Sequence, residues 1–258
     1  MALAAEQSTH AAVFQYLLHL ADTSLILGQR LSEWVGLGPT LEDDLALGNV
    51  SLDLIGQARL LYTYAGEIEG LGRSEDDLAL LRAPEEFRNL NLVEQPNGDF
   101  GVTTVRQFLF DAWQIEIFQA LAGSADLRLA EIAEKSLTEA RYHLRYSGGW
   151  LIRLGDGNDE SHRRVSTPLE DLWKYTAELF TPDRVDEQMQ RVGIGPDLVS
   201  LRGSWSDRLD EVLERATLKR PQNVGYTWFG KAGAHTDNLG HILADMQYMQ
   251  RAYPGASW

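Results

Sequence analysis

Residues 139–150 read EARYHLRYSGGW and place a carboxylate and an imidazole within one helical pattern. Glu139 and His143 are four residues apart, so in a helix both side chains lie on one face. The stretch belongs to a longer helical pattern at about 127–154. A polar pair on the inner face of a helix has two interpretations: half of a carboxylate-bridged metal site, or a hydrogen-bonded pair in a helical core, with Arg59 or Arg145 as the donor.

The helical period continues through most of the chain. We expect three further long helices, at about 10–35, 41–67 and 100–121, separated by turns that contain Gly or Pro. Residues 155–164, GDGNDESHRR, are predicted to form a loop. Shorter helices are expected at about 75–82, 168–179, 183–191, 204–216 and 236–252.

Strands are not predicted, because no alternating pattern of useful length occurs. Four long helices joined by short or moderate links predict an all-α four-helix bundle with additional C-terminal helices. Since no Pro/Ser-rich linker divides the chain, residues 1–258 are expected to form a single domain.

The composition excludes several classes of protein. Lys plus Arg number 23 and Asp plus Glu 38, which gives a net charge of -15 and argues against a nucleic-acid binder or a polybasic membrane anchor. We see no signal peptide and no apolar run long enough to span a membrane. Cysteine is absent, so thiolate chemistry is excluded. A cytoplasmic protein is expected.

Each predicted long helix carries an acidic residue near its midpoint, on the apolar stripe. Packed side by side, the helices would place these acids and two neighbouring side chains at one level of the core. Burying several carboxylates costs free energy unless a metal, cations or hydrogen bonds compensate. The predicted layer consists of Asp22, Asp53, Gln57, Asp111, Glu139 and His143.

Helical bundles that hold two irons supply a Glu from each of two helices and a Glu-x-x-His pair from each of the other two. This layer departs from that plan, because Gln57 is a poor iron ligand and the side chains of Asp22 and Asp111 are each shorter than Glu. The segments DLIGQAR (53–59) and EARYHLR (139–145) resemble each other, as a duplicated helix pair would. The pattern indicates an inherited metal layout with at least one ligand lost, and no metal or catalytic residue is expected.

The sequence resembles the non-catalytic subunits of the bacterial ring-1,2-phenylacetyl-CoA epoxidase, in the PaaA/PaaC family. The resemblance covers nearly the whole chain. The blocks that carry it are ILGQRLSEWVG (26–36), LALGNVSLDLIGQARLLYTYAGE (45–67), NLNLVEQPNGDF (89–100), DAWQIEIF (111–118), EARYHLRYSGGWLIRLGDG (139–157) and KAGAHTDNLGHILADMQYMQRAYPG (231–255).

This resemblance implies a ferritin-like fold and a partner. In the family, a homologous catalytic oxygenase subunit (PaaA-like) keeps the di-iron ligands and binds phenylacetyl-CoA, and other epoxidase components deliver electrons from NADPH. The resemblance therefore implies that this chain binds no cofactor and supports the di-iron subunit. Two alternatives stay open: the chain is itself a di-iron oxygenase with atypical ligands, or it is a stand-alone homodimer that binds acyl-CoA.

Two further groups of residues need an interpretation. Arg141, Arg145 and Arg153, followed by Arg163 and Arg164, concentrate positive charge near the end of the fourth helix, either for CoA phosphates or a partner, or for ion pairs within the chain. His235 and His241 are six residues apart, a spacing that does not share a helix face. We therefore interpret HTDN (235–238) as a helix start capped by Thr236.

Overall fold

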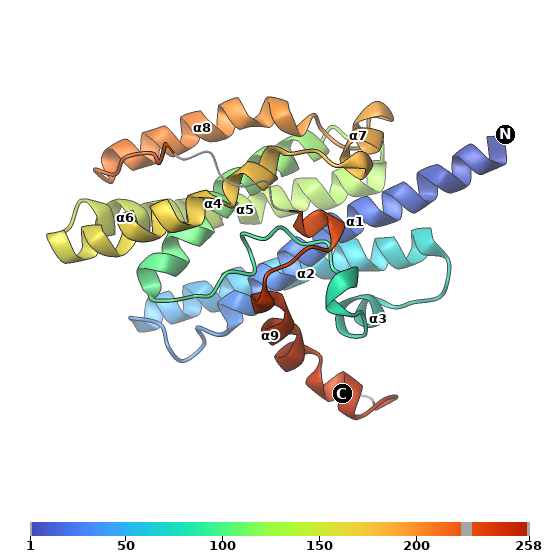
Figure 1. Ribbon diagram of the computed structural model, residues 1–258, viewed down its shortest axis with the longest axis horizontal. Helices are drawn as coiled ribbons and strands as arrows, with labels where there is room; N and C mark the ends of the chain where they lie inside the picture. Colours follow the sequence, from blue (N-terminus) through green and yellow to red (C-terminus); the bar gives the residue numbers. More distant parts are fainter. Residues whose placement is uncertain (1, 223–228, 257–258) are drawn as a thin grey trace. The chain divides into compact units, whose positions relative to one another are not determined.

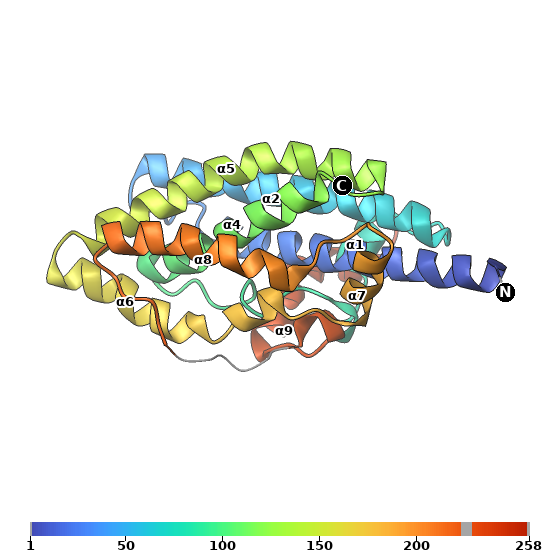
Figure 2. The ribbon, with the colours of Figure 1, turned by 90° about the horizontal axis from the view of Figure 1, so that it is seen from above.

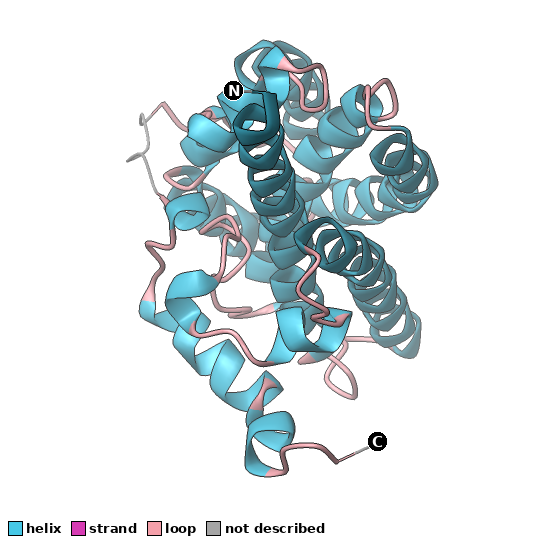
Figure 3. Ribbon diagram, turned by 90° about the vertical axis from the view of Figure 1, so that its right-hand side faces the viewer, coloured by secondary structure: helices cyan, strands magenta, loops and turns pink. Residues whose placement is uncertain are grey.

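The computed structural model describes residues 2–222 and 229–256, and side chains from residue 9 onward. The described residues form ten α-helices and short 3-10 turns, with no strand (Figure 3). The all-α prediction is confirmed, and the helices suit a ferritin-like bundle. The chain divides into two compact units, Met1–Pro96 with Asp183–Met189 and Phe229–Trp258, and Asn97–Pro182 with Gln190–Trp228. That residues 1–258 form a single domain stays a prediction.

Unit 1 is built on an antiparallel helix pair, α1 (Ala2–Ser32) and α2 (Leu41–Glu69), drawn in dark and light blue in Figure 1. The two helices approach closely at Gly28, where a Cβ would meet the carbonyl oxygen of Ser51 at 3.2 Å. Glycine is needed here because any side chain would push the helices apart. The remaining elements of the unit are α3 (Glu75–Leu80), η1 (Pro84–Glu86), the start of α7 (Arg184–Arg191), η3 (Gly230–Ala232), α9 (Asp237–Met246) and α10 (Tyr248–Ala252).

Unit 2 contains the second antiparallel pair, α4 (Phe100–Leu121) and α5 (Leu127–Gly155), which lie side by side in Figures 1 and 2. Helix α4 is buried almost all round and also packs against two further helices of the unit. Two indole N–H groups, of Trp113 and Trp205, donate to the carbonyl oxygens of Leu179 (3.0 Å) and Leu109 (3.2 Å). The other elements are α6 (Asp159–Trp173), η2 (Thr176–Phe180) and α8 (Leu198–Arg215).

The long helices begin where capping residues predict. Thr40 accepts a hydrogen bond from the N–H of Asp43 at the start of α2, and Gly70 ends that helix with φ 70°. Asp99 and Asp126 cap α4 and α5 in the same way. These side chains satisfy N–H groups that have no partner inside the helix.

Several predicted boundaries in the C-terminal half were wrong. The helix predicted at 168–179 is divided, because α6 ends at Trp173 and η2 follows it. The predicted loop 155–164 is helical from Asp159, because Asn158 forms a capping box with Ser161. Helix α8 begins at Leu198 and not at 204, because Asp197 caps it by accepting from Val199 and Ser200. The predicted helix 236–252 is broken at Gln247, whose side chain donates to the carbonyl oxygen of Arg82.

One segment, Thr9–Ser32 of α1, is long and apolar enough to cross a membrane by length and composition alone. Within the fold, 89% of its most apolar window is buried. That burial is typical of the core helix of a folded bundle.

Candidate functional site

The predicted polar layer is found in two parts. Asp22, Asp53 and Gln57 belong to unit 1, and Asp111, Glu139 and His143 belong to unit 2. The prediction that all six side chains lie at one level joins the two units and stays a prediction.

Asp22 is fully buried in unit 1 and is surrounded by donors. The guanidinium of Arg82 donates to both carboxylate oxygens, and the N–H of Arg88 donates to Oδ2 at 2.7 Å. The hydroxyl of Tyr62 donates to Oδ1. We call these four residues the Asp22 cluster. A buried carboxylate is tolerated when a cation pairs with it and further donors form hydrogen bonds to its oxygens, as Arg82, Tyr62 and Arg88 do at Asp22.

Electrostatics within the Asp22 cluster agree with this geometry. Burial, with the nearby Asp22 carboxylate, raises the pKa of Tyr62 well above its usual value, so the phenol keeps its proton. Burial alone would lower the pKa of Arg82, but electrostatic interactions with Asp22, Tyr62 and Glu86 and the hydrogen bond to Asp22 together raise that pKa. The guanidinium of Arg82 also lies over the rings of Tyr62 and Phe87, at 5.6 and 4.2 Å from their centroids. Arg82 therefore supplies a fixed positive charge beside the Asp22 carboxylate. In a metal site, the metal ion would supply that charge.

The other two predicted residues of unit 1 lie on α2. Gln57 is buried, with 1% of its surface exposed, and Asp53 is half-buried. Arg59 was one expected donor to the layer, and that expectation was wrong. Its side chain is 72% exposed and pairs with Glu75, with Nε 2.6 Å from the carboxylate.

In unit 2, Asp111 lies on α4 and is also fully buried, but its donors are neutral. Gln107 donates to Oδ1 at 2.6 Å and Ser147 donates to Oδ2 at 2.7 Å. Burial raises the pKa of Asp111 to about 6, although the nearby His143 and the two hydrogen bonds act to lower it. We call Asp111, Gln107, Ser147 and His143 the Asp111 cluster.

Glu139 and His143, the pair of the opening stretch, lie one turn apart on α5. His143 is fully buried and Glu139 is half-buried. Arg145 was the second expected donor to this pair, but its guanidinium lies over the Tyr142 ring at 5.5 Å. The charge of His143 acts to lower the pKa of Asp111, which places the imidazole near that carboxylate in the helical core.

The donor sets can be tested against a di-iron centre, which the fold family implies. Both oxygens of Asp22 already accept hydrogen bonds, and the Arg82 guanidinium donates to each of them, so neither oxygen is left for a metal ion. Each oxygen of Asp111 accepts one hydrogen bond as well. Gln57 offers a neutral amide where iron prefers imidazole or carboxylate. These residues do not fit a pair of irons.

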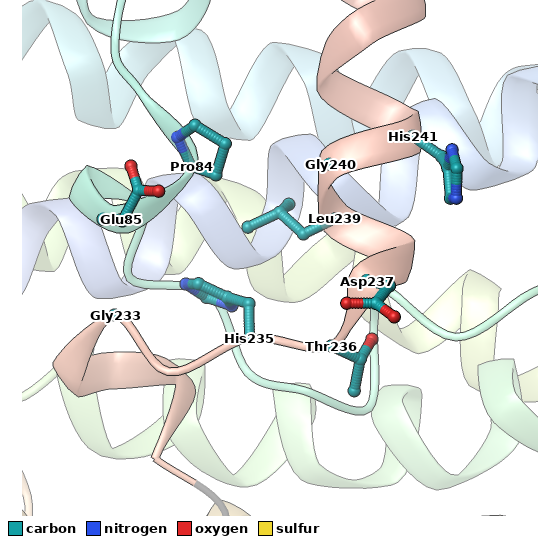
Figure 4. A pocket seen from close by; sticks show the side chains of 9 residues that line it. All are labelled: Pro84, Glu85, Gly233, His235, Thr236, Asp237, Leu239, Gly240 and His241. Carbon is teal, nitrogen blue, oxygen red and sulfur yellow. The ribbon is translucent and has the colours of Figure 1, made fainter.

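The histidines near the C-terminus line a cavity of about 670 Å³ with Pro84, Glu85 and the start of α9 (Figure 4). His235 contacts the carboxylate of Glu94 through Nδ1 at 2.9 Å and the carbonyl oxygen of Phe87 through Nε2 at 3.0 Å. His241 lies farther along α9 and points away from His235 (Figure 4). Thr236 directly precedes α9, as predicted, although its side chain makes no capping hydrogen bond.

Three arginines of α5 and α6, Arg153, Arg163 and Arg164, contact other side chains of this chain. Arg164 pairs with Glu160 and Asp99, and Arg163 pairs with Glu160. Arg153 lies over the ring of Trp150 at 5.2 Å. These contacts agree with the interpretation that the basic residues interact within the chain. The side chain of Arg141 is exposed.

Sequence reasoning missed three residues that organise unit 1: Tyr62, Arg82 and Glu94. Glu94 is fully buried and accepts hydrogen bonds from Asn89 at 3.0 Å and from the N–H of Thr236 at 2.6 Å, besides its contact with His235. Arg82 and Glu94 lie outside the long helices, so no periodicity marks them as buried. A buried arginine is visible in the sequence only after its acidic partner is known.

Comparison with known proteins agrees with the geometry. Residues 2–258 match the model of the PaaA/PaaC family, described as phenylacetic acid catabolic protein. The chain belongs to this family. It is also 48% identical over 243 residues to a 1,2-phenylacetyl-CoA epoxidase subunit, the one designated C, of Escherichia coli strain K12, covering 94% of this chain and 98% of that protein. The resemblance inferred from the sequence is confirmed.

Proposed function

We propose that the chain is the structural, non-catalytic subunit of a multicomponent 1,2-phenylacetyl-CoA epoxidase. The observation that carries the proposal is the 48% identity to the Escherichia coli epoxidase subunit along 98% of its length. A protein named as one subunit of an epoxidase assembles with other subunits, so partner subunits follow from the same relationship. The chemical step would then take place in a partner.

The Asp22 cluster supports the non-catalytic role. In this chain the buried carboxylate of α1 is neutralised by Arg82, which is part of the fold and cannot leave as a metal ion can. A fixed cation of this kind keeps the helix pair packed without any cofactor. We infer that no iron is held by the predicted layer and that the di-iron centre belongs to a PaaA-like catalytic partner in the cytoplasm.

The two alternatives require features that the described residues do not favour. A di-iron oxygenase would need Asp22 and Asp111 free to bind metal, and both carboxylates accept hydrogen bonds on each oxygen. A stand-alone acyl-CoA homodimer would need cations for the CoA phosphates, and Arg163 and Arg164 pair with Glu160. The subunit role needs neither feature.

Reconstitution tests the proposal. This chain is mixed with the catalytic oxygenase subunit and the remaining epoxidase components, and phenylacetyl-CoA-dependent oxygen consumption is measured. We expect no turnover by this chain alone, and turnover by the mixture only when this chain is present. Asp111→Asn in this chain should leave the turnover of the mixture within about twofold, whereas the same change at a di-iron ligand would remove a charge that iron needs.

Two results would overturn the proposal. The first is oxygen-dependent turnover of phenylacetyl-CoA by this chain without the catalytic subunit. The second is loss of turnover in the mixture with Asp111→Asn, provided that the variant still co-purifies with its partner.

A further inference from the structure

A second polar cluster in unit 1 shares no residue with the predicted layer and is not explained by the subunit role. It consists of His19 on α1 and of Asp183 and Asp186 at the start of α7. His19 and Asp186 are each 5% exposed, and Asp183 is 29% exposed at its side chain. One ligand atom from each residue lies within 4.8 Å of the others. Imidazole and carboxylate are the ligand types of divalent transition metals.

The hydrogen bonds of the two carboxylates leave one oxygen of each directed at His19. The N–H of Asp186 donates to Asp183 Oδ1 at 2.8 Å, and the N–H of Asp183 donates to Asp186 Oδ2 at 3.0 Å, as in a capping box. Lys231 also donates to Asp186 Oδ2. Within the described part of the chain, Asp183 Oδ2 and Asp186 Oδ1 accept no hydrogen bond.

The distances from the imidazole to these two oxygens are those of neighbouring ligands and not those of hydrogen bonds. His19 Nε2 is 3.6 Å from Asp183 Oδ2, and His19 Nδ1 is 3.7 Å from Asp186 Oδ1. A protonated imidazole paired with a carboxylate would approach to about 2.7–2.9 Å. Two ligands at about 2.1 Å from one tetrahedral zinc ion are separated by about 3.4 Å, close to the distance between each oxygen and its neighbouring imidazole nitrogen.

Two buried polar atoms beside the carboxylates make no hydrogen bond among the described residues. They are Nδ1 of His19 and the hydroxyl oxygen of Tyr16, whose side chain is 2% exposed. The Tyr16 and His19 rings are 6.3 Å apart, edge to face. Burial, with the negative charge of Asp186, raises the pKa of Tyr16 far above its usual value. Buried polar atoms without partners are uncommon, and an ion or water at the site is one of their explanations.

We propose that His19, Asp183 and Asp186 bind a divalent transition-metal ion of the Zn²⁺ class. One imidazole nitrogen and one oxygen of each carboxylate are the three protein ligands, which lie within 4.8 Å of one another. Lys231 and the capping hydrogen bonds hold the other carboxylate oxygens and so fix the ligands. The ion joins α7 to α1. This site differs from the expectation that the chain binds no metal, and it does not depend on the proposed function.

The test is a titration of the full chain with Zn²⁺ alone, after chelation and desalting, followed by calorimetry. The informative variant is Asp183→Asn, because Asn caps a helix as well as Asp does but is a much poorer ligand. The matched control is Asp197→Asn, which makes the same change at the capping residue of α8. We expect one Zn²⁺ per chain, with affinity lowered at least about tenfold in Asp183→Asn and unchanged in Asp197→Asn.

Thermal unfolding gives an independent readout. Zn²⁺ should raise the midpoint of the wild type and of Asp197→Asn, and should raise that of Asp183→Asn much less, because only a ligand of the folded state stabilises it. His19→Gln serves as the second variant and should also lose affinity. The proposal is overturned if Asp183→Asn and Asp197→Asn bind Zn²⁺ equally, or if the wild type shows no saturable binding near one equivalent.

Discussion

The Asp22 cluster and the Asp111 cluster place the same residue type in the same situation with different partners. Each carboxylate lies on the first helix of an antiparallel pair, and each is fully buried. Asp22 is held by the guanidinium of Arg82, whereas Asp111 is held by the neutral groups of Gln107 and Ser147, near His143. The comparison shows that a buried acid can be accommodated either by a fixed positive charge or by a pKa raised toward neutrality.

The two clusters should therefore respond to the same substitution with opposite signs. Replacing Asp by Asn removes a negative charge in both places. In the Asp22 cluster this leaves the charge of Arg82 without a counterion. In the Asp111 cluster it removes a charge that burial disfavours.

Asp22→Asn should give the largest effect, a loss of about 3–5 kcal/mol in the free energy of unfolding, because a buried guanidinium loses its partner. Urea denaturation followed by circular dichroism measures the loss. Asp76→Asn, at an exposed position of α3, is the control and should change stability by less than about 0.5 kcal/mol.

A double variant sharpens the result. Adding Arg82→Met to Asp22→Asn removes the unpaired charge, so the double variant should be more stable than Asp22→Asn alone. If the double variant is instead less stable than Asp22→Asn, by as much as Arg82→Met alone destabilises the wild type, the unpaired charge of Arg82 is not the reason for the loss in Asp22→Asn.

Asp111→Asn should raise the free energy of unfolding at neutral pH and leave it unchanged at acidic pH. The pKa of Asp111 rises from 3.8 to about 6 in the folded state, so the folded state binds this proton more tightly than the unfolded state does. This proton contributes its full stabilisation below about pH 4, and the contribution is lost as the pH rises to about 6. A shift of about two pKa units corresponds to about 3 kcal/mol in the free energy of unfolding.

At pH 7.5 the variant avoids that loss and should be more stable than the wild type by up to about 3 kcal/mol, and at pH 4 the difference should vanish. The amide can also donate to Oε1 of Gln107, which is buried without a partner. Urea midpoints at several pH values measure the difference. A difference that does not change with pH would contradict the assignment of a proton to Asp111.

Tyr62→Phe should have an intermediate effect. It removes one hydrogen bond to Asp22 and leaves the ion pair with Arg82, so the expected loss is about 1.5–2 kcal/mol. Chemical denaturation at pH 7.5 measures it, and a loss as large as that of Asp22→Asn would show that Arg82 is not the main partner.

Arg59→Gln should have the smallest effect. The pair of Arg59 with Glu75 is a surface ion pair, since the arginine side chain is 72% exposed. Such pairs contribute less than about 0.5 kcal/mol in most measurements. The midpoint of thermal unfolding should stay close to that of the wild type, and a large fall would place Arg59 in the polar layer after all.

The sequence predicts the long helices well because their signals are local. Apolar residues recur at helical spacing, and Thr40, Asp99 and Asp126 mark where helices begin. The start of α6 was missed because Asp159, in its first turn, follows a Gly-rich polar run that resembles a loop. The break at Gln247 depends on a contact with Arg82, more than 160 residues away in the chain, and no local pattern carries it.

The candidate site was predictable in part for the same reason. Asp22, Asp111 and His143 lie on helical stripes, so their burial follows from the period. The identity of their partners did not follow. Arg59 and Arg145 were chosen by spacing along the same helices, but the guanidinium that binds Asp22 comes from Arg82, beyond the end of α3.

The central claim is that the carboxylates of Asp22 and Asp111 accept hydrogen bonds from side chains and backbone of this chain, whereas a di-iron centre would need them as metal ligands. The most direct measurement is the iron content after anaerobic Fe(II) loading and desalting, on the wild type and on Asp183→Asn so that iron at the His19 site is counted separately. The claim predicts almost no iron in Asp183→Asn. About two irons per chain in that variant, as di-iron bundles hold, would contradict it and make Glu139 and His143 ligands of an oxygenase.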